Sequence, residues 1–352
     1  TDLVAGPDII FFWVARMIIA GYAFCNDKPF SNVYFTGIVR DKIGRKMSKS
    51  LGNSPDPLEL IDKFGADGVR MGIMLAAPAG HDIMYDDSLC EQGRNFCNKI
   101  WNAFRLVKGW EVDREKPQPE AARCGVEWFE AEMNRCLIEV EDLMGKFRIS
   151  EALMAIYKLF WDEFSSWYLE VVKPAYGSPI DGKTYEETLR FFDTLLRLLH
   201  PFMPFITEEL WQHLYDRKEG ESIMTAQIPT ADGFDQDIID RFDVLKEVVA
   251  GVRTVRKQKQ IPQREPLALL VKGPNDGSLN SILEKMGNLD SIETVDEKPG
   301  AAASFIVGST EYSIPLKDNV NVEEELKKLN ADLEYQQKFL DSVRKKLSNE
   351  KF

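Results

Sequence analysis

The stretch "GRKMSKSLGN", residues 44–53, places two lysines and two serines in one loop bounded by glycines. Lysine is a compact point charge suited to single phosphate oxygens, and serine hydroxyls can donate hydrogen bonds to the same oxygens. Gly44 and Gly52 allow the backbone to bend and to approach a ligand closely. The pattern differs from a P-loop, since GxxxxGKS and GxxxxGKT are both absent. The loop therefore indicates phosphate binding, although a solvated basic loop has the same composition.

The elements around this loop are predicted from the sequence pattern. Residues 8–24 favour a helix, residues 33–36 a strand, and Asp56-Pro57 the start of another helix, because proline is tolerated in the first turn. The apolar run at residues 9–20 is shorter than the ~20 residues that span a bilayer and is interrupted by Arg16. We therefore expect a buried helix there and no membrane segment.

A long helical region follows. From about residue 87 to residue 215, apolar side chains recur at spacings of three and four, as on the buried face of a helix. Residues 111–120 interrupt this pattern and are expected to be a linker. Long helices with short links indicate a helical bundle. The repeating positions include Phe96, Ile100, Trp101 and Phe104, and later Leu153, Ile156, Tyr157, Phe160, Phe164 and Trp167.

The last third of the chain changes pattern twice. Four short apolar runs between residues 266 and 315 are expected to be strands and residues 281–286 a helix, which fits a small α/β unit. A heptad spacing then predicts a coiled-coil helix, with Gln336 in one apolar position. Its apolar positions are Val322, Leu326, Leu329, Leu333, Leu340, Val343 and Leu347.

Composition narrows the class of protein. The net charge of -13 argues against a generally basic nucleic-acid coat but leaves room for a local basic face. The five cysteines are odd in number and form no CxxC pair, so neither a disulfide framework nor a zinc site is expected. We expect a reduced, cytoplasmic protein without a metal site.

The signature "KMSKS" at residues 46–50, with the flanks at residues 33–53 and 56–75, resembles the class I aminoacyl-tRNA synthetases. Three further pieces resemble the valyl-tRNA synthetase family within that class: "DIIFFWVARM" at residues 8–17, "NFCNKIWNA" at residues 95–103, and the helical stretches "FWDEFSSWYLEVVKP" and "LLRLLHPFMPFITEELWQHL". The resemblance covers essentially the whole chain.

The resemblance implies a mainly α-helical protein in four parts. Residues 1–88 would be the C-terminal piece of a Rossmann-type catalytic domain that carries the signature loop. Residues 89–265 would be a helical anticodon-binding domain, residues 266–318 a small α/β subdomain, and residues 319–352 the start of a coiled-coil arm that binds tRNA.

The resemblance also implies an activity. Members of this family condense valine with ATP to valyl-adenylate and then transfer valine to its tRNA. Lys46 and Lys49 would stabilise the departing pyrophosphate, and Lys49 is the stronger candidate of the two. Met47, Ser48 and Ser50 would complete the ATP-binding loop. Mg²⁺ would arrive with ATP, because no protein metal site is identifiable.

Two short segments are implied to contact the small substrates. By resemblance, Gly6 and Asp8 contact adenosine, although Asp8 could instead cap the helix that follows; Pro7 departs from the residue usual in the family. Ile9 and Trp13, four residues apart, would line the valine side-chain pocket, with ordinary core packing as the alternative.

Basic residues suggest where tRNA binds. Residues 241–264 hold seven Lys or Arg against two acids, and Arg253, Arg256 and Lys257 lie on one helical sector, which fits contact with phosphates or a solvated charged face. Lys338, Arg344 and Lys345 in the heptad helix could touch tRNA too, but such positions are charged in any coiled coil. In the bundle, His200 is expected to be a structural histidine.

One expected part of the active site is missing from the sequence. Class I synthetases use a HIGH motif on the ATP phosphates, and none of His81, His200 and His213 stands in such a pattern. We therefore expect a fragment that is inactive alone and lacks the editing domain, from an enzyme that is a monomer. A non-catalytic tRNA-binding or assembly module and an isoleucyl-type synthetase are the alternatives.

Overall fold

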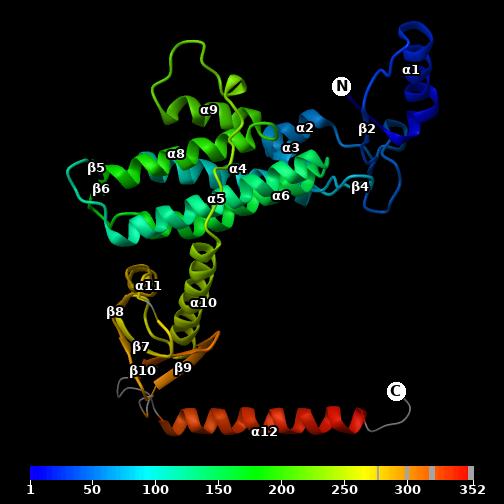
Figure 1. Ribbon diagram of the computed structural model, residues 1–352. Coiled ribbons are helices and arrows are strands. Elements are labelled where there is room, and N and C mark those ends of the chain that lie inside the picture. The colour runs from blue at the N-terminus through cyan, green and yellow to red at the C-terminus, as the bar shows by residue number, and fades with distance from the viewer. Residues whose placement is uncertain (276, 298–299, 301, 317–321, 348–352) are drawn as a thin grey trace. The chain divides into compact units, whose positions relative to one another are not determined.

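The computed structural model describes all residues except 276, 298–299, 301, 317–321 and 348–352 (Figure 1). In the last helix, the side chains of residues 322–329, 332 and 345–347 also lie outside the description. The chain divides into two compact units, Thr1–Asp243 and Val244–Phe352. The described residues are mostly helical, which confirms the predicted fold class at this level.

The first unit opens with a parallel pair of strands, β1 (Asp2–Ala5) and β2 (Asn32–Phe35), in which Asp2 lies opposite Asn32. A helical segment crosses between them, as a parallel pair requires. It consists of a 3₁₀ turn (Pro7–Ile9), a π-helical turn (Ile10–Val14), α1 (Ala15–Ala20) and a second π-helical turn (Gly21–Cys25).

The prediction of a buried helix in this segment is wrong. Phe11 is 83% and Phe24 88% exposed, and Val14 is the one buried side chain of the 19-residue segment Pro7–Cys25. By length and composition alone the segment could cross a membrane, a test that core helices of other proteins also pass. Its apolar face is open because the described residues offer only a two-stranded sheet beside it, which is too narrow to cover a helix.

The signature loop lies between two short parallel strands, β3 (Val39–Arg40) and β4 (Ile83–Met84). Between them come α2 (Pro57–Phe64) and α3 (Ala66–Leu75). The predicted helix start is confirmed, since the Asp56 side chain caps α2 by accepting a hydrogen bond from the backbone N–H of Leu58. A small core of Leu60, Phe64, Tyr85 and Cys90 lies beneath the loop.

The predicted helical bundle follows. The described helices are α4 (Asp87–Lys108), α5 (Glu120–Gly145), α6 (Ile149–Lys158), a π-helical stretch (Leu159–Tyr168), α7 (Leu169–Val172), α8 (Gly182–Leu199) and α9 (Pro204–Leu214). The strands β5 (Val112–Asp113) and β6 (Ile180–Asp181) pair beside α8 (Figure 1). Fully buried aromatic rings at Phe96, Phe160, Phe164 and Phe192 fill the core in edge and tilted contacts.

Helix α3 joins the signature-loop region to this bundle. A side chain at Gly93 on α4 would put a Cβ 2.0 Å from the carbonyl oxygen of Gly68, so glycine allows the two helix backbones to touch. The Asp67 carboxylate accepts hydrogen bonds from the backbone N–H groups of Phe205 (3.3 Å) and Ile206 (2.6 Å), which begin α9. Burial raises the pKa of Asp67, although these two hydrogen bonds act to lower it.

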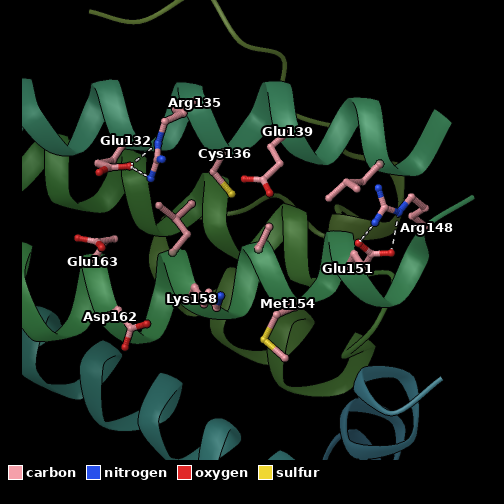
Figure 2. A pocket seen from close by; sticks show the side chains of 13 residues that line it. Glu132, Arg135, Cys136, Glu139, Arg148, Glu151, Met154, Lys158, Asp162 and Glu163 are labelled. Carbon is pink, nitrogen blue, oxygen red and sulfur yellow. Dashed lines mark hydrogen bonds and ion pairs between the residues drawn. The ribbon is translucent and has the colours of Figure 1, made fainter. Parts of the chain in front are cut away.

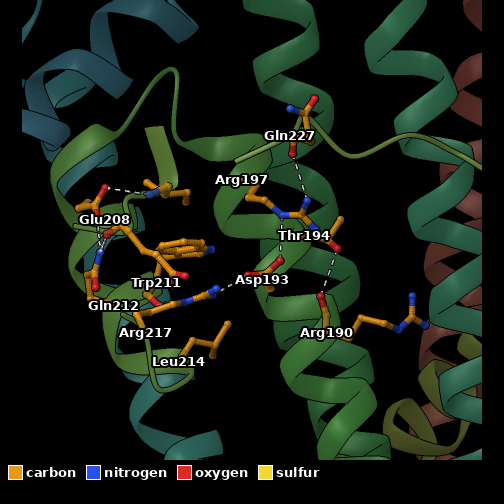
Figure 3. Close-up of polar contacts among 12 residues, drawn as sticks. Arg190, Asp193, Thr194, Arg197, Glu208, Trp211, Gln212, Leu214, Arg217 and Gln227 are labelled. Atoms are coloured by element: carbon orange, nitrogen blue, oxygen red, sulfur yellow. Dashed lines mark hydrogen bonds and ion pairs between the residues drawn. The ribbon is translucent and has the colours of Figure 1, made fainter. Parts of the chain in front are cut away.

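Polar contacts hold the segment after α9 against the bundle (Figure 3). Asp193 on α8 pairs with Arg197 (2.8 Å) and Arg217 (3.2 Å), and the Arg217 guanidinium lies 3.4 Å from the centre of the Trp211 ring. Glu208 accepts hydrogen bonds from the Ser222 hydroxyl and the Ile223 backbone N–H at the start of a 3₁₀ turn (Ile223–Thr225).

Helix α10 (Gln236–Gln258) leads into the second unit. The predicted strands are present as β7 (Leu267–Lys272), β8 (Leu289–Thr294), β9 (Ala302–Val307) and β10 (Thr310–Pro315), with α11 (Asn280–Gly287) between the first two. The sheet order is β8-β7-β10-β9, and only the β7–β8 pairing is parallel.

The predicted coiled-coil segment forms helix α12 (Val322–Leu347). Of its heptad positions, Leu333 and Leu340 are exposed, while the side chains of Val322, Leu326, Leu329 and Leu347 lie outside the described residues. Because no second helix is described against this seam, the coiled coil stays a prediction.

Candidate functional site

The signature loop folds back on itself and points its lysines outward. Lys46 forms an antiparallel bridge with Arg40, and the Met47 backbone N–H donates to the Val39 carbonyl oxygen at 3.2 Å. The Met47 side chain packs on the small core below, whereas Lys46 and Lys49 are exposed. The apolar residue of the signature therefore fixes the loop, and the two cations remain accessible to an anion.

The two serines shape the turn that carries Lys49. Ser48 is extended and caps the 3₁₀ turn Lys49–Leu51, since its hydroxyl accepts a hydrogen bond from the Ser50 backbone N–H at 3.2 Å. The two hydroxyls lie 2.6 Å apart. Gly52 ends the turn in the left-handed region at φ +64°, a conformation that favours glycine.

Two further residues hold this loop, and the sequence analysis missed both. The Asn53 side chain bonds to the loop backbone and to Asp41, which in turn pairs with Arg45. The hydrogen bond from Asn53 and the contacts with Arg45 hold the pKa of Asp41 far below its usual range. A signal was available for Asp41 alone, because aspartate at the first position and glycine at the fourth are typical of a β-turn.

Asp8 and Lys46, 38 residues apart in sequence, meet in space. The Lys46 Nζ atom lies 3.0 Å from Asp8 Oδ2, and this lysine lowers the pKa of the Asp8 carboxyl. The N-cap position of the helical segment is Gly6, and Asp8 lies in its first turn. A Cβ at Gly6 would come within 2.8 Å of the Asp8 carboxylate, so glycine leaves room for that carboxylate. The structure thus brings together Asp8, which is predicted to contact adenosine, and Lys46, which is predicted to bind phosphates.

The two residues implied for the valine pocket are accessible to different degrees. Ile9 is half-buried at the end of the 3₁₀ turn, and Trp13 is 50% exposed on the π-helical turn that follows. Neither is fully packed, so the alternative of ordinary core packing does not describe Trp13.

The basic cluster on α10 requires one correction. Arg256 is 2% exposed, so it cannot contact tRNA phosphates as predicted. Its guanidinium donates to the carbonyl oxygens of Pro262, Glu265, Gly287 and Asn288 at 2.8–3.0 Å. Helical periodicity placed it beside Arg253 and Lys257, but the polypeptide that packs against α10 covers it. Arg253 and Lys257 are exposed.

His200 is held in place by a threonine hydroxyl. The His200 Nδ1 lies 2.7 Å from the Thr207 hydroxyl, which itself donates to the Met203 carbonyl oxygen. Since the hydroxyl proton is used, Nδ1 must carry the proton that binds Thr207. Burial lowers the pKa of His200, so the neutral ring is favoured. This fits the predicted structural histidine.

A cleft of about 560 Å³ lies between α5 and the α6 helix with its π-helical continuation (Figure 2). Five acidic and three basic side chains line it, and two of the pairs are neutralised within one helix: Glu132 with Arg135, and Arg148 with Glu151. Burial raises the pKa of the Cys136 thiol there to about 12, which leaves it protonated and unreactive. The excess of acids disfavours a phosphate ligand in this cleft.

Metal ligation has no basis in the part of the chain that the structure describes. No group of three or more His, Cys, Asp or Glu side chains there could hold a metal ion.

Comparison with known proteins gives consistent matches along the chain. Residues 1–86 match the family described as tRNA synthetases class I (I, L, M and V), and residues 126–271 match the anticodon-binding domain of tRNA ligase. The chain is 67% identical over its full length to the valine–tRNA ligase of Phocaeicola vulgatus and 63% identical to that of Parabacteroides distasonis. It spans 40% of the length of each of these relatives.

A solved structure supports the fold alone. The chain is similar to the agnB2 LeuRS of Agrobacterium radiobacter K84, solved in a ternary complex with tRNA and LeuAMS, with a TM-score of 0.50 and 18% identity. The similarity covers 99% of this chain and 35% of that one.

Proposed function

The chain belongs to the valine–tRNA ligase family of the class I tRNA synthetases, and from this premise we propose that it is the part of such a ligase that supplies the KMSKS loop and binds tRNA. The whole enzyme would use ATP to attach valine to its tRNA. The observation that carries this proposal is the pair of exposed lysines, Lys46 and Lys49, on a loop whose backbone is fixed by Met47 and Asn53.

In the first step, the valine carboxylate attacks the α-phosphorus of ATP, which forms valyl-adenylate and releases pyrophosphate. Negative charge grows on the departing phosphates, so cations aimed at them stabilise the transition state more than the ground state. Lys46 and Lys49 would supply these cations. Ser48 and Ser50 would hold the turn that presents Lys49.

Adenosine binding would draw on the first residues of the chain. The Asp8 carboxylate would accept hydrogen bonds from ribose hydroxyls, and Gly6 gives it the space to do so. The Lys46–Asp8 pair would then be replaced, as Lys46 turns to the phosphates and Asp8 to the ribose. Ile9 and Trp13 would present apolar surface to the valine side chain.

In the second step, a terminal ribose hydroxyl of the valine tRNA attacks the carbonyl carbon of the adenylate, and AMP leaves. The exposed Arg253 and Lys257 of α10 would bind tRNA phosphates. Arg256 has no part in this proposal, because it is buried and both of its terminal nitrogens donate to carbonyl oxygens inside the second unit.

The rest of the ATP site is absent from this sequence, since no histidine stands in a HIGH pattern. Mg²⁺ would enter with ATP, and no step assigned to this chain depends on it.

The test is valine-dependent ATP–pyrophosphate exchange by the full-length ligase that contains this segment. We expect Lys49→Ala to lower kcat by roughly 10²–10³-fold, as does the loss of one preorganised donor from a transition state. Lys146→Ala is the matched control, because Lys146 is also an exposed lysine and pairs with Asp142 of α5. Unchanged exchange in a Lys46→Ala, Lys49→Ala double variant would contradict the proposal. Valine-dependent exchange by the chain alone would contradict the expectation that this part of the ligase is inactive by itself.

A further inference from the structure

We propose that Asp41, acting through Asn53, is a positioning residue for the two lysines of the signature loop. The inference rests on the proposed function, since its effect is on the adenylation step. Asp41 touches neither lysine side chain in the described contacts, so its influence must pass through the loop backbone.

Asp41 accepts four hydrogen bonds, three from the turn at residues 43–45 and one from Asn53. Its Oδ1 accepts from the backbone N–H groups of Ile43 (3.1 Å) and Arg45 (2.9 Å). Its Oδ2 accepts from the Arg45 Nε (2.8 Å) and from the Asn53 Nδ2 (3.0 Å). The side chain is 14% exposed, so these bonds are largely shielded from water. One carboxylate therefore closes the turn before the signature and holds the residue that follows it.

Asn53 passes this constraint to the signature itself. Its Oδ1 accepts a hydrogen bond from the Ser48 backbone N–H at 2.9 Å, and its Nδ2 also donates to the Lys46 carbonyl oxygen at 3.4 Å. These are the two backbone groups on either side of Met47, whose side chain packs on the core below. The backbone that carries Lys46 and leads to Lys49 is thus held from both faces.

The chemistry of the two side chains explains their types. Asn53 must donate and accept at once, and an amide does both, whereas a carboxylate only accepts. Asp41 must accept from four donors, which a carboxylate can do with two oxygens and an amide cannot. Hydrogen bonds to a charged acceptor are also stronger than those between neutral groups. This strength suits the Asp41–Asn53 clamp, the pair of side chains that holds a loop which must otherwise move.

The base of the turn is tied to a distant segment as well. Arg40 pairs with Asp82 and donates from Nη1 to the Gly44 carbonyl oxygen at 3.2 Å. Gly44 lies at φ +83°, where glycine is favoured, so the turn can close over the Asp41 carboxylate. The Asp41–Asn53 clamp is therefore anchored to the region of β3 and β4 as well as to the loop.

The test uses the full-length ligase that contains this segment and measures kcat and KM for ATP in valine-dependent exchange. We expect Asp41→Asn and Asn53→Asp each to lower kcat by roughly ten- to a hundredfold, the loss that one charge-assisted hydrogen bond corresponds to. KM for ATP should change little, because the lysines act mainly on the departing pyrophosphate. In Asp41→Asn, the amide NH₂ groups of positions 41 and 53 face each other and neither can accept. In Asn53→Asp, two carboxylates face each other and neither can donate.

The double variant Asp41→Asn with Asn53→Asp reverses the donor and acceptor and restores one hydrogen bond between the two positions. We expect its kcat to exceed that of either single variant, a non-additivity that a general loss of stability does not produce. Asp142→Asn is the matched control, because it removes an exposed carboxylate from an ion pair on α5. It should leave kcat unchanged.

The outcomes separate the two proposals. Active wild-type enzyme with unchanged kcat in both single variants overturns the clamp alone. The same holds if kcat falls only in proportion to the folded fraction seen in thermal unfolding, or if the double variant is no better than the singles. A wild-type enzyme without valine-dependent exchange overturns the proposed function, and the clamp with it.

Discussion

Identical residue types on one helix take opposite roles in this protein. Arg253 and Arg256 are three positions apart on α10, yet the first is exposed and the second is 2% exposed. The buried guanidinium binds carbonyl oxygens from two separate segments, at residues 262–265 and 287–288. Its planar, five-donor geometry suits this task, which a lysine ammonium cannot perform. Arg256 is therefore part of the second unit's framework.

Replacing Arg256 with lysine should destabilise the second unit without a specific effect on tRNA affinity. We expect the free energy of unfolding to fall by roughly 2–4 kcal/mol, because several carbonyl oxygens around the buried side chain lose their hydrogen-bond donors. Chemical denaturation followed by circular dichroism measures this. Arg253→Lys is the control and should change stability by less than about 0.5 kcal/mol, as exposed substitutions usually do. Equal effects of the two variants would contradict the framework role.

The contact between α3 and α4 decides how the signature loop is joined to the bundle. A Cβ at Gly72 would come within 2.2 Å of the Leu89 carbonyl oxygen, and one at Gly93 within 2.0 Å of the Gly68 carbonyl oxygen. Glycine at these places lets the helix backbones meet without intervening side chains. The same helix α3 reaches α9 through Asp67, and the Arg70 Nε donates to the Phe202 carbonyl oxygen at 3.0 Å. Short-range helix contacts thus connect the loop region with the bundle.

Gly93→Ala should force α3 and α4 apart. We expect a loss of about 1–3 kcal/mol in the free energy of unfolding, the usual range for overpacking a tight contact. Gly145→Ala is the matched control on α5, because a Cβ there meets no atom within 4 Å. Alanine favours the helix, so this variant should gain up to about 1 kcal/mol. Thermal unfolding of both proteins compares them directly, and a Gly93→Ala protein as stable as the control would refute the close contact.

At the scale of the whole molecule, the helical segment Pro7–Cys25 departs from an ordinary globular surface. Its large apolar side chains are mostly exposed, including Phe11, Phe12, Ile19 and Phe24. Monomeric soluble proteins rarely leave such a contiguous patch open. The bundle, by contrast, fully buries the rings of Phe96, Phe160, Phe164 and Phe192. The chain therefore combines a well-packed region with an open apolar face.

We expect the purified chain to self-associate through this face. Light scattering should show an average mass that rises with protein concentration. Phe11→Glu with Phe24→Glu should shift the chain toward monomer, because burying the new charges is unfavourable. Phe205→Glu is the control, since Phe205 is also exposed, at 64%, but belongs to α9 and not to the segment Pro7–Cys25. A monodisperse monomer of the unmodified chain would contradict the prediction.

Sequence alone determined what depends on neighbours along the chain. Spacings of three and four predicted the helices that bury Phe96 and Phe160, and four short apolar runs predicted β7 to β10. Helix starts such as Asp56-Pro57 follow from local sterics and capping. The signature at residues 46–50 indicated its chemistry by residue type, because charge and hydrogen-bonding capacity belong to the side chain itself.

Tertiary structure decided which side chains are covered and which meet. Nothing near Arg256 in sequence shows that residues 287–288 will accept its hydrogen bonds, and nothing near Asp41 shows that Asn53 will donate to it. The apolar run at residues 9–20 looked like a core helix, yet its exposure depends on how much sheet lies beside it. Burial is a property of what packs against a residue from elsewhere in the chain, so periodicity fixes the face of a helix but not its partner.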